Sequence, residues 1–220
     1  MDIAILSSSG IDYLFRWGHF LFGVAWIGLL YYFNFVQTEY FKEAEASAKA
    51  DALQKLAPRA LWWFRWAALF TFLTGFGLLG FKGPASNLYT YTAALLGTLM
   101  FLNVWLIIWP NQKKVIAGAE DAARAGAKAG LASRTNTLFS APMLFFMGAS
   151  THLPAGSTPD GGYTLAAGAS STALVAAVLI VLALEANAIW GRTGPITTVN
   201  GVIGSSLVLT LLLYFVLQFL

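Results

Sequence analysis

The sequence of 220 residues contains no cysteine. This absence excludes disulfides, thiolate metal sites, iron–sulfur clusters and covalent attachment of a c-type haem through a Cys-x-x-Cys-His motif. A metal or cofactor would therefore depend on histidine, carboxylate, methionine or backbone ligands. Only two histidines are present, His19 and His152.

Charge is also scarce: 10% of the residues are charged, whereas 58% are hydrophobic. A soluble domain normally carries about 25% charged residues, so this composition predicts an integral membrane protein. The net charge of +3 is small, and the basic residues fall between apolar runs rather than in a patch. Nucleic-acid binding therefore has no support. The N-terminus lacks a basic segment and a small-residue cleavage site, and we expect no removed signal peptide.

Apolar stretches close to the roughly 20 residues that cross a bilayer occur six times. Helices are the expected form, because the ten-residue alternation typical of a membrane barrel does not occur. We therefore predict one all-α integral membrane domain over 1–220, a polytopic bundle of about six transmembrane helices. The expected spans are approximately 13–37, 60–81, 88–109, 135–153, 164–190 and 201–220. The Ala-, Lys- and Glu-rich connections at 38–59 and 111–134 should extend the flanking helices into water before the chain turns.

Lysine and arginine are distributed unevenly between the connections. Four occur between the first and second spans and five between the third and fourth, with Arg192 after the fifth. The other side has only Lys82, with Arg16 at the edge of the first span. Because basic residues are enriched on the cytoplasmic side, both termini are predicted to lie outside. The tryptophans in WWFRW at 62–66, together with Trp105 and Trp109, then fall where a cytoplasmic aromatic belt belongs.

In this topology His19 and His152 lie in the outer leaflet, each with a glycine four residues away, Gly23 and Gly148. Positions i and i+4 share one helix face, so each histidine is presented beside a small residue. A haem b between helices requires two neutral imidazoles and a slot for the flat macrocycle. The pattern therefore predicts haem iron ligation by His19 and His152. The alternatives are an interhelical or proton-handling histidine, or packing with glycines that allow close helix approach.

Two further residues of the first span fit the haem hypothesis. Arg16 lies one turn outward from His19, where it could meet a propionate. Trp26 lies two turns deeper on the same face and would form an apolar wall.

A second group of polar residues falls in the cytoplasmic half of the spans. Charged residues inside a membrane are costly, and we expect them to face protein or water. Four members form a candidate pocket for an anionic substrate, and the alternative is an interhelical polar clasp with snorkelling arginines. The four candidates are Arg65, Arg134, Asn136 and Glu185; Asn34, Asn103 and Asn187 complete the group.

Three segments carry a family resemblance: RWGHFLFGVAWIGLLYYFNFVQ (16–37), PRALWWFRWAALFTFLTG (58–75) and SRTNTLFSAPMLFFMGASTH (133–152). They resemble the N-terminal membrane domain of the bacterial membrane-bound urate oxidase (urate hydroxylase) family, here without its C-terminal cytochrome c domain. The resemblance implies a multi-pass protein of the bacterial inner membrane and a periplasmic cytochrome c as electron acceptor. The positions it carries over are His19, Gly23, Trp26, Arg134, Asn136 and His152.

The sequence thus leads to two expectations of different kinds. The first is an oxidoreductase or oxidoreductase subunit that binds haem b and passes electrons outward, with a small molecule oxidised at the cytoplasmic cluster. The second is a cofactor-free accessory or assembly subunit of a larger membrane (respiratory) complex. A transporter ranks last, because a matched pair of interrupted helices does not occur.

Overall fold

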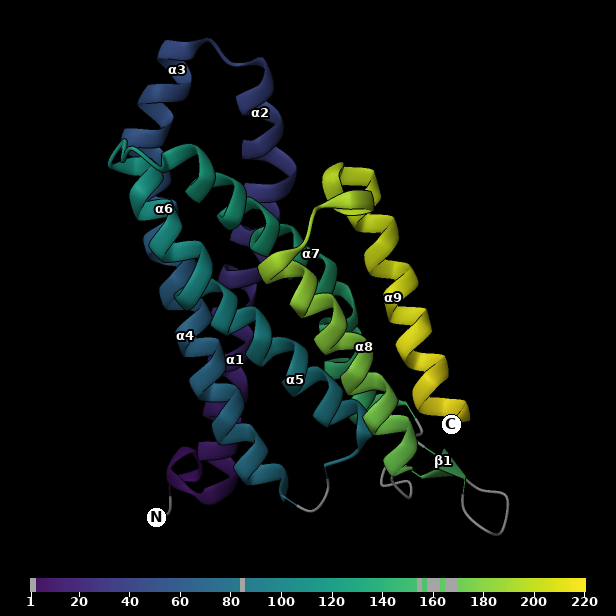
Figure 1. Ribbon diagram of the computed structural model, residues 1–220. Helices are drawn as coiled ribbons and strands as arrows, with labels where there is room; N and C mark the ends of the chain where they lie inside the picture. The colour runs from purple at the N-terminus through teal and green to yellow at the C-terminus, as the bar shows by residue number, and fades with distance from the viewer. Residues whose placement is uncertain (1–2, 84–85, 154–155, 158–162, 165–169) are drawn as a thin grey trace. The chain divides into compact units, whose positions relative to one another are not determined.

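A computed structural model describes residues 3–83, 86–153, 156–157, 163–164 and 170–220 (Figure 1). Helices account for nearly all of these residues, which confirms the all-α fold class. The exception is a short antiparallel pair of strands, β1 (Gly156–Ser157) and β2 (Tyr163–Thr164). By its internal contacts the chain forms two units, residues 1–83 with 101–133 and residues 84–100 with 134–220. We call them unit 1 and unit 2.

The first part of the chain forms three long helical stretches, the first two in unit 1 and the third divided between unit 2 (to residue 100) and unit 1 (from residue 101). After the short η1 (Ala4–Leu6), helix α1 (Ser8–Tyr31) continues through a π-helical segment, η2 (Tyr32–Gln37), into α2 (Thr38–Glu43). The chain then returns through α3 (Ala46–Asp51), the π-helical η3 (Ala52–Leu56) and α4 (Ala57–Lys82). The third stretch comprises α5 (Leu88–Leu102), the π-helical η5 (Asn103–Ile108) and α6 (Trp109–Ile116).

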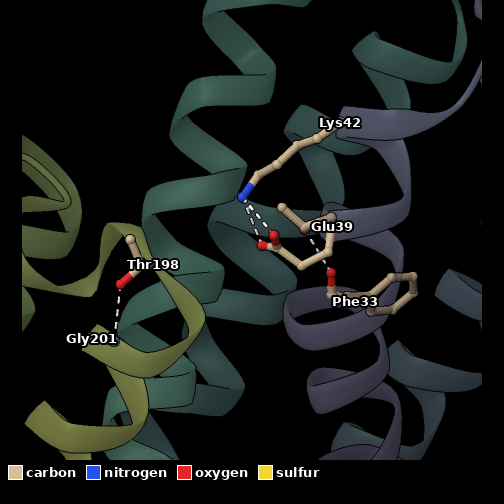
Figure 2. Close-up of polar contacts among 6 residues, drawn as sticks. Phe33, Glu39, Lys42, Thr198 and Gly201 are labelled. Carbon is tan, nitrogen blue, oxygen red and sulfur yellow. Dashed lines mark hydrogen bonds and ion pairs between the residues drawn. The ribbon is translucent and has the colours of Figure 1, made fainter.

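The remaining helices are α7 (Ala122–His152), α8 (Ser171–Trp190), the 3-10 helix η6 (Gly194–Thr197) and α9 (Val199–Phe219). The start predicted for the fifth span was too early. Thr164 belongs to β2, and α8 begins only after Ser170, whose hydroxyl accepts a hydrogen bond from the Ala173 N–H. Thr198 caps α9 in the same way, through the N–H of Gly201 (Figure 2). These caps satisfy backbone donors that have no partner inside the helix.

The polar connections are helical, as predicted. The first span runs on through α2, where the Glu39 carboxylate accepts two hydrogen bonds from Lys42, both 2.8 Å (Figure 2). Glu39 and Lys42 are three positions apart, and Asp51 and Lys55 form an ion pair four positions apart on the returning segment. Such pairs stabilise an exposed helix by a few tenths of a kcal/mol each. The connections therefore extend the helices beyond the apolar segments.

Five helical stretches among the described residues are long and apolar enough to cross a membrane. They cover Ser8–Glu43, Ala46–Lys82, Leu88–Ile116, Ser171–Trp190 and Val199–Phe219, and each overlaps one of the six predicted spans. Helix α7 holds the other span, predicted at 135–153, but is not sufficiently apolar to join them. Its segment TNTLFS at 135–140 carries four polar residues, and Pro142 lies inside the helix. The fourth crossing and the outward orientation of the termini stay predictions.

Helices α1 and α4 pack closely along much of their length (Figure 1). Glycines make this approach possible. A Cβ at Gly77 of α4 would collide with the ring of Phe15, and a Cβ at Gly18 of α1 would meet the Thr74 methyl at 3.6 Å. Small residues at such a contact bring two membrane helices together so that one can seat the side chains of the other. This contact determines the surroundings of His19.

Candidate functional site

His19 lies on α1 with its imidazole against α4. Its Nδ1 lies 2.9 Å from the carbonyl oxygen of Thr71 and 3.2 Å from the hydroxyl oxygen of Thr74. The Thr74 hydroxyl itself donates to the Phe70 carbonyl at 2.6 Å, so that its lone pairs are available to His19. Both hydrogen bonds of this ring within the described residues are therefore made by one nitrogen.

The Thr71 contact defines the tautomer of His19. A carbonyl oxygen only accepts hydrogen bonds, so a nitrogen 2.9 Å from it must carry the proton. In the neutral ring this leaves Nε2 unprotonated, with its lone pair directed away from the proton-bearing nitrogen. A metal-binding histidine normally shows this arrangement, in which the second nitrogen donates to a carbonyl and so orients the ring. The surroundings of His19 therefore fit an imidazole that ligates through Nε2.

Gly75 is the glycine that directly contacts the His19 ring. A Cβ at position 75 would lie 2.9 Å from Cε1 of His19 and 3.3 Å from Nδ1. By contrast, a Cβ at Gly23 would lie 3.9 Å from the Thr71 methyl, an ordinary contact. The sequence pairing of His19 with Gly23 missed Gly75, because a glycine on another helix has no fixed spacing from the histidine.

The two auxiliary haem residues have different surroundings. The guanidinium of Arg16 pairs with Asp12, with Nε 2.8 Å from Oδ2, and its side chain is 54% exposed. Trp26 is 1% exposed, and its indole Nε1 makes no hydrogen bond to the described residues. Trp26 is thus buried, and its role as an apolar wall beside a haem stays a prediction. A propionate contact for Arg16 stays a prediction and would compete with Asp12.

His152 is the last residue of α7 and is exposed. Gly148, one turn earlier, is also exposed, and a Cβ there would meet no atom within 4 Å. The space at Gly148, one turn before His152, is thus open, and a ligand slot there stays a prediction. His19 belongs to unit 1 and His152 to unit 2, so their approach to a common iron stays a prediction.

Three of the four substrate candidates are buried in unit 2. Arg134 is 6% exposed, Asn136 0% and Glu185 8%. Asn136 donates through Nδ2 to the carbonyl of Met100 at 2.9 Å, which ties α7 to α5 within this unit. These side chains therefore face protein, as expected for polar groups inside a span. Asn187, at the end of α8, instead bonds the backbone of Arg192 and serves as a local cap.

The other polar residues predicted for the cytoplasmic half of the spans belong to unit 1. The Arg65 guanidinium lies 3.8 Å from the centre of the Trp109 ring. Asn34, in η2, donates to the Leu30 carbonyl at 2.9 Å and to the Ser133 hydroxyl at 2.8 Å. Asn103, at the start of η5, is 1% exposed. Two π-helical segments of this unit thus carry a buried asparagine, and such segments frequently occur at functional sites.

The described part of the chain contains no group of side chains that could form a metal centre of several carboxylates. Within those residues, three or more His, Asp or Glu side chains never gather closely enough to hold a metal ion. Two shallow surface hollows, along 171–179 of α8 and 4–13 near the N-terminus, contain none of the candidate site residues.

The long apolar helices and buried intramembrane polar groups define a multi-pass α-helical membrane protein. The family described as Urate oxidase N-terminal matches residues 81–203, more than half of the chain. The chain belongs to this family, which confirms the resemblance drawn from the sequence. Neither the curated proteins nor the solved structures gave a match.

The matched range has a specific relation to the candidate residues. It contains Gly148, His152 and the three buried polar residues of unit 2, Arg134, Asn136 and Glu185. The first span with His19, and Arg65 on α4, precede it. The family match therefore supports the resemblance of segment 133–152 directly, whereas the two earlier segments depend on the sequence likeness alone.

Proposed function

We propose that this chain is a membrane redox protein, or a redox subunit of a larger membrane complex, that holds haem b through His19 and His152. When bound, haem b would supply one-electron transfer. We further propose that the electrons leave on the outer side, to a soluble acceptor such as a periplasmic cytochrome c. The location would be a bacterial inner membrane. The observation that carries the proposal is the anchored imidazole of His19, with Nδ1 held by the Thr71 carbonyl at 2.9 Å.

The residues of α1 and α4 would contribute in distinct ways. The carbonyl of Thr71 holds the proton of His19 on Nδ1 and fixes the ring orientation, with Thr74 as a second acceptor. Gly75 leaves room for the ring against α4. Trp26, buried on the same helix as His19, would exclude water. His152, with open space at Gly148, would supply the second nitrogen.

The visible spectrum of the purified protein, expressed with sufficient haem, tests this proposal. We expect a Soret band in the spectrum. On reduction, the spectrum should also show α and β bands of the form typical of a haem with two histidine ligands. His19→Ala and His152→Ala should each abolish that low-spin form, and the double variant should lose the haem. Asn200→Ala, an exposed polar residue on α9, is the control and should leave the spectrum unchanged.

A protein that folds normally but shows no Soret band would overturn the haem proposal. So would a band unchanged in the double histidine variant. The cofactor-free accessory subunit would then be the better description. Co-migration with a respiratory complex on a native gel would support that description.

We also propose that Arg134, Asn136 and Glu185, which are each buried in unit 2, together form the binding site for an anionic small molecule that donates the electrons. The support is that Arg134, a permanent cation, is 6% exposed within a segment matched by the family. Urate, which the family description names, is the first compound to test. Urate-dependent reduction of added cytochrome c is the measurement. Arg134→Gln should abolish it and Arg134→Lys should retain part; activity unchanged in Arg134→Gln would contradict this site.

A further inference from the structure

Two cations approach the same tryptophan where α4 and α6 lie side by side in unit 1 (Figure 1). The Arg65 guanidinium lies 3.8 Å from the ring centre of Trp109, and the Lys113 ammonium lies 5.6 Å from it. Both distances are within the range of a cation–π interaction. Two positive charges thus share one ring, although like charges repel each other.

No carboxylate of the described residues forms an ion pair with Arg65 or Lys113. The neighbouring Lys114 differs, because it pairs with Asp121 at 2.7 Å. Arg65 is half-buried and Lys113 is exposed. This part of unit 1 therefore presents two positive charges whose compensating anion is not supplied by the described protein.

The surrounding tryptophans carry indole N–H groups, which can donate hydrogen bonds but cannot accept them. Trp66 and Trp105 meet edge to face, with ring centres 5.7 Å apart. Their indole Nε1 atoms are buried and make no hydrogen bond to any described residue. Trp62 and Trp63, on the turn before Arg65, are 45% and 63% exposed. The cluster combines charge, unsatisfied donors and exposed aromatic surface, which is the composition of a membrane-interface anchor.

The position along the helices matches the headgroup region. Arg65 lies near the start of the apolar part of α4, and Trp109 lies at the end of the apolar part of the third span. These two ends are on the side that the lysine and arginine distribution assigns to the cytoplasm. Basic clefts between membrane helices on that side bind anionic lipid headgroups. A phospholipid phosphate there would bring both the missing negative charge and hydrogen-bond acceptors.

We propose that Arg65 and Lys113, held against Trp109, bind the phosphate of an anionic phospholipid headgroup. Trp62 and Trp63 would lie along the glycerol and upper acyl region of the same lipid. Arginine suits this role because its planar guanidinium can donate to two phosphate oxygens while one face stacks on an indole. This proposal uses neither histidine and does not depend on the haem proposal.

The test is lipid binding to the purified full chain in a non-ionic detergent, measured by native mass spectrometry. Phosphatidylglycerol is titrated against phosphatidylcholine with the same acyl chains. A basic residue near a membrane surface contributes enough to predict about fivefold weaker phosphatidylglycerol binding for Arg65→Gln or Lys113→Gln. The double variant should lose at least about tenfold, while phosphatidylcholine binding stays unchanged. Arg65→Lys, which keeps the charge, should retain more binding than Arg65→Gln.

The matched control is the double variant Lys128→Gln, Arg192→Gln, which removes one lysine and one arginine that are exposed elsewhere. It should bind phosphatidylglycerol like the unaltered protein. If both double variants lose phosphatidylglycerol binding equally, the loss reflects the lower net charge of the protein, and the proposed site is overturned. Unchanged binding in the Arg65, Lys113 variant would also overturn it. Inorganic phosphate at millimolar concentration should not displace the lipid, and displacement would assign the site to free phosphate instead.

A second measurement needs no variant and so does not depend on the folding of one. The unaltered protein in nanodiscs should show stronger quenching of tryptophan fluorescence by brominated phosphatidylglycerol than by brominated phosphatidylcholine at the same mole fraction. Equal quenching by the two lipids would overturn the proposal.

Discussion

The imidazole of His19 is bonded to the backbone of another helix, with Nδ1 2.9 Å from the carbonyl oxygen of Thr71. That carbonyl also lies 3.0 Å from the Thr74 hydroxyl oxygen. The ring reaches the α4 backbone because residue 75 has no side chain. The consequence is a histidine whose proton position is determined by the fold.

The first prediction is the tautomer of His19. Nitrogen NMR of the protein with labelled histidine, at a pH where the ring is neutral, should show a protonated Nδ1 and an unprotonated Nε2, because the Thr71 carbonyl can only accept. His19→Gln assigns the signal by removing it, and exposed His152 is the internal comparison. A neutral His19 with its proton on Nε2 would contradict the hydrogen bond to Thr71.

The second prediction concerns Gly75. Gly75→Ala places a methyl group 2.9 Å from Cε1 of His19, and the ring or the helix must shift. Overpacking of this kind costs about 1–3 kcal/mol, measurable by equilibrium unfolding in mixed micelles. Gly80→Ala, on the same helix with no atom within 4 Å of the new methyl, is the control. It should be neutral or stabilise by about 0.5–1 kcal/mol. Equal effects of the two substitutions would argue against a packed ring at Gly75.

The contrast between Gly23 and Gly75 shows how far the sequence predicts the surroundings of His19. Composition and apolar length suffice for helices, because crossing a bilayer imposes them. The i, i+4 spacing places Gly23 on the face of His19, since that relation is internal to one helix. Gly75 is 56 positions away on α4 and contacts the ring only through helix packing, which periodicity does not encode. The bond from Asn136 to the Met100 carbonyl was unpredictable for the same reason.

Helix ends show a similar division between local and non-local information. The helical extensions around 38–59 follow from strong local helix formers such as alanine, lysine and glutamate, and they were predicted. The start of α8 was placed too early, at 164, because an apolar Ala-rich segment precedes α8 in the sequence and hydrophobicity does not reveal that Thr164 pairs with Gly156 of β1. The π-helical segments η2 and η5 have no reliable sequence signal.

The third prediction concerns pH and the connection between α6 and α7. Lys114, 2.7 Å from the Asp121 carboxylate, holds the pKa of that carboxyl below its usual range, with a smaller contribution from Arg124 at 3.5 Å. The contribution of these ion pairs to stability is therefore present above the ordinary aspartate pKa. It is lost as the pH falls through the lowered pKa of the folded protein.

Carboxyl NMR titration checks this directly. Lys114→Gln should raise the pKa of Asp121 toward its ordinary value, and Arg124→Gln should raise it less, because its nitrogen lies farther away. A larger effect of Arg124→Gln, or no effect of either substitution, would show that Lys114 is not the main cause.

The fourth prediction concerns Asn136, which is fully buried and donates to the Met100 carbonyl at 2.9 Å. Asn136→Ala removes this link between α7 and α5 and leaves buried groups of unit 2 without their hydrogen bond. Losing a partner of a buried polar group costs about 1–3 kcal/mol, and equilibrium unfolding in mixed micelles should show that loss. Asn200→Ala, an exposed asparagine on α9, should change the free energy of unfolding by less than about 0.5 kcal/mol. If Asn136→Ala is as mild as Asn200→Ala, the hydrogen bond to Met100 does not hold α7 in place. Asn136 would then be better explained as a residue kept for a bound molecule than as an interhelical link.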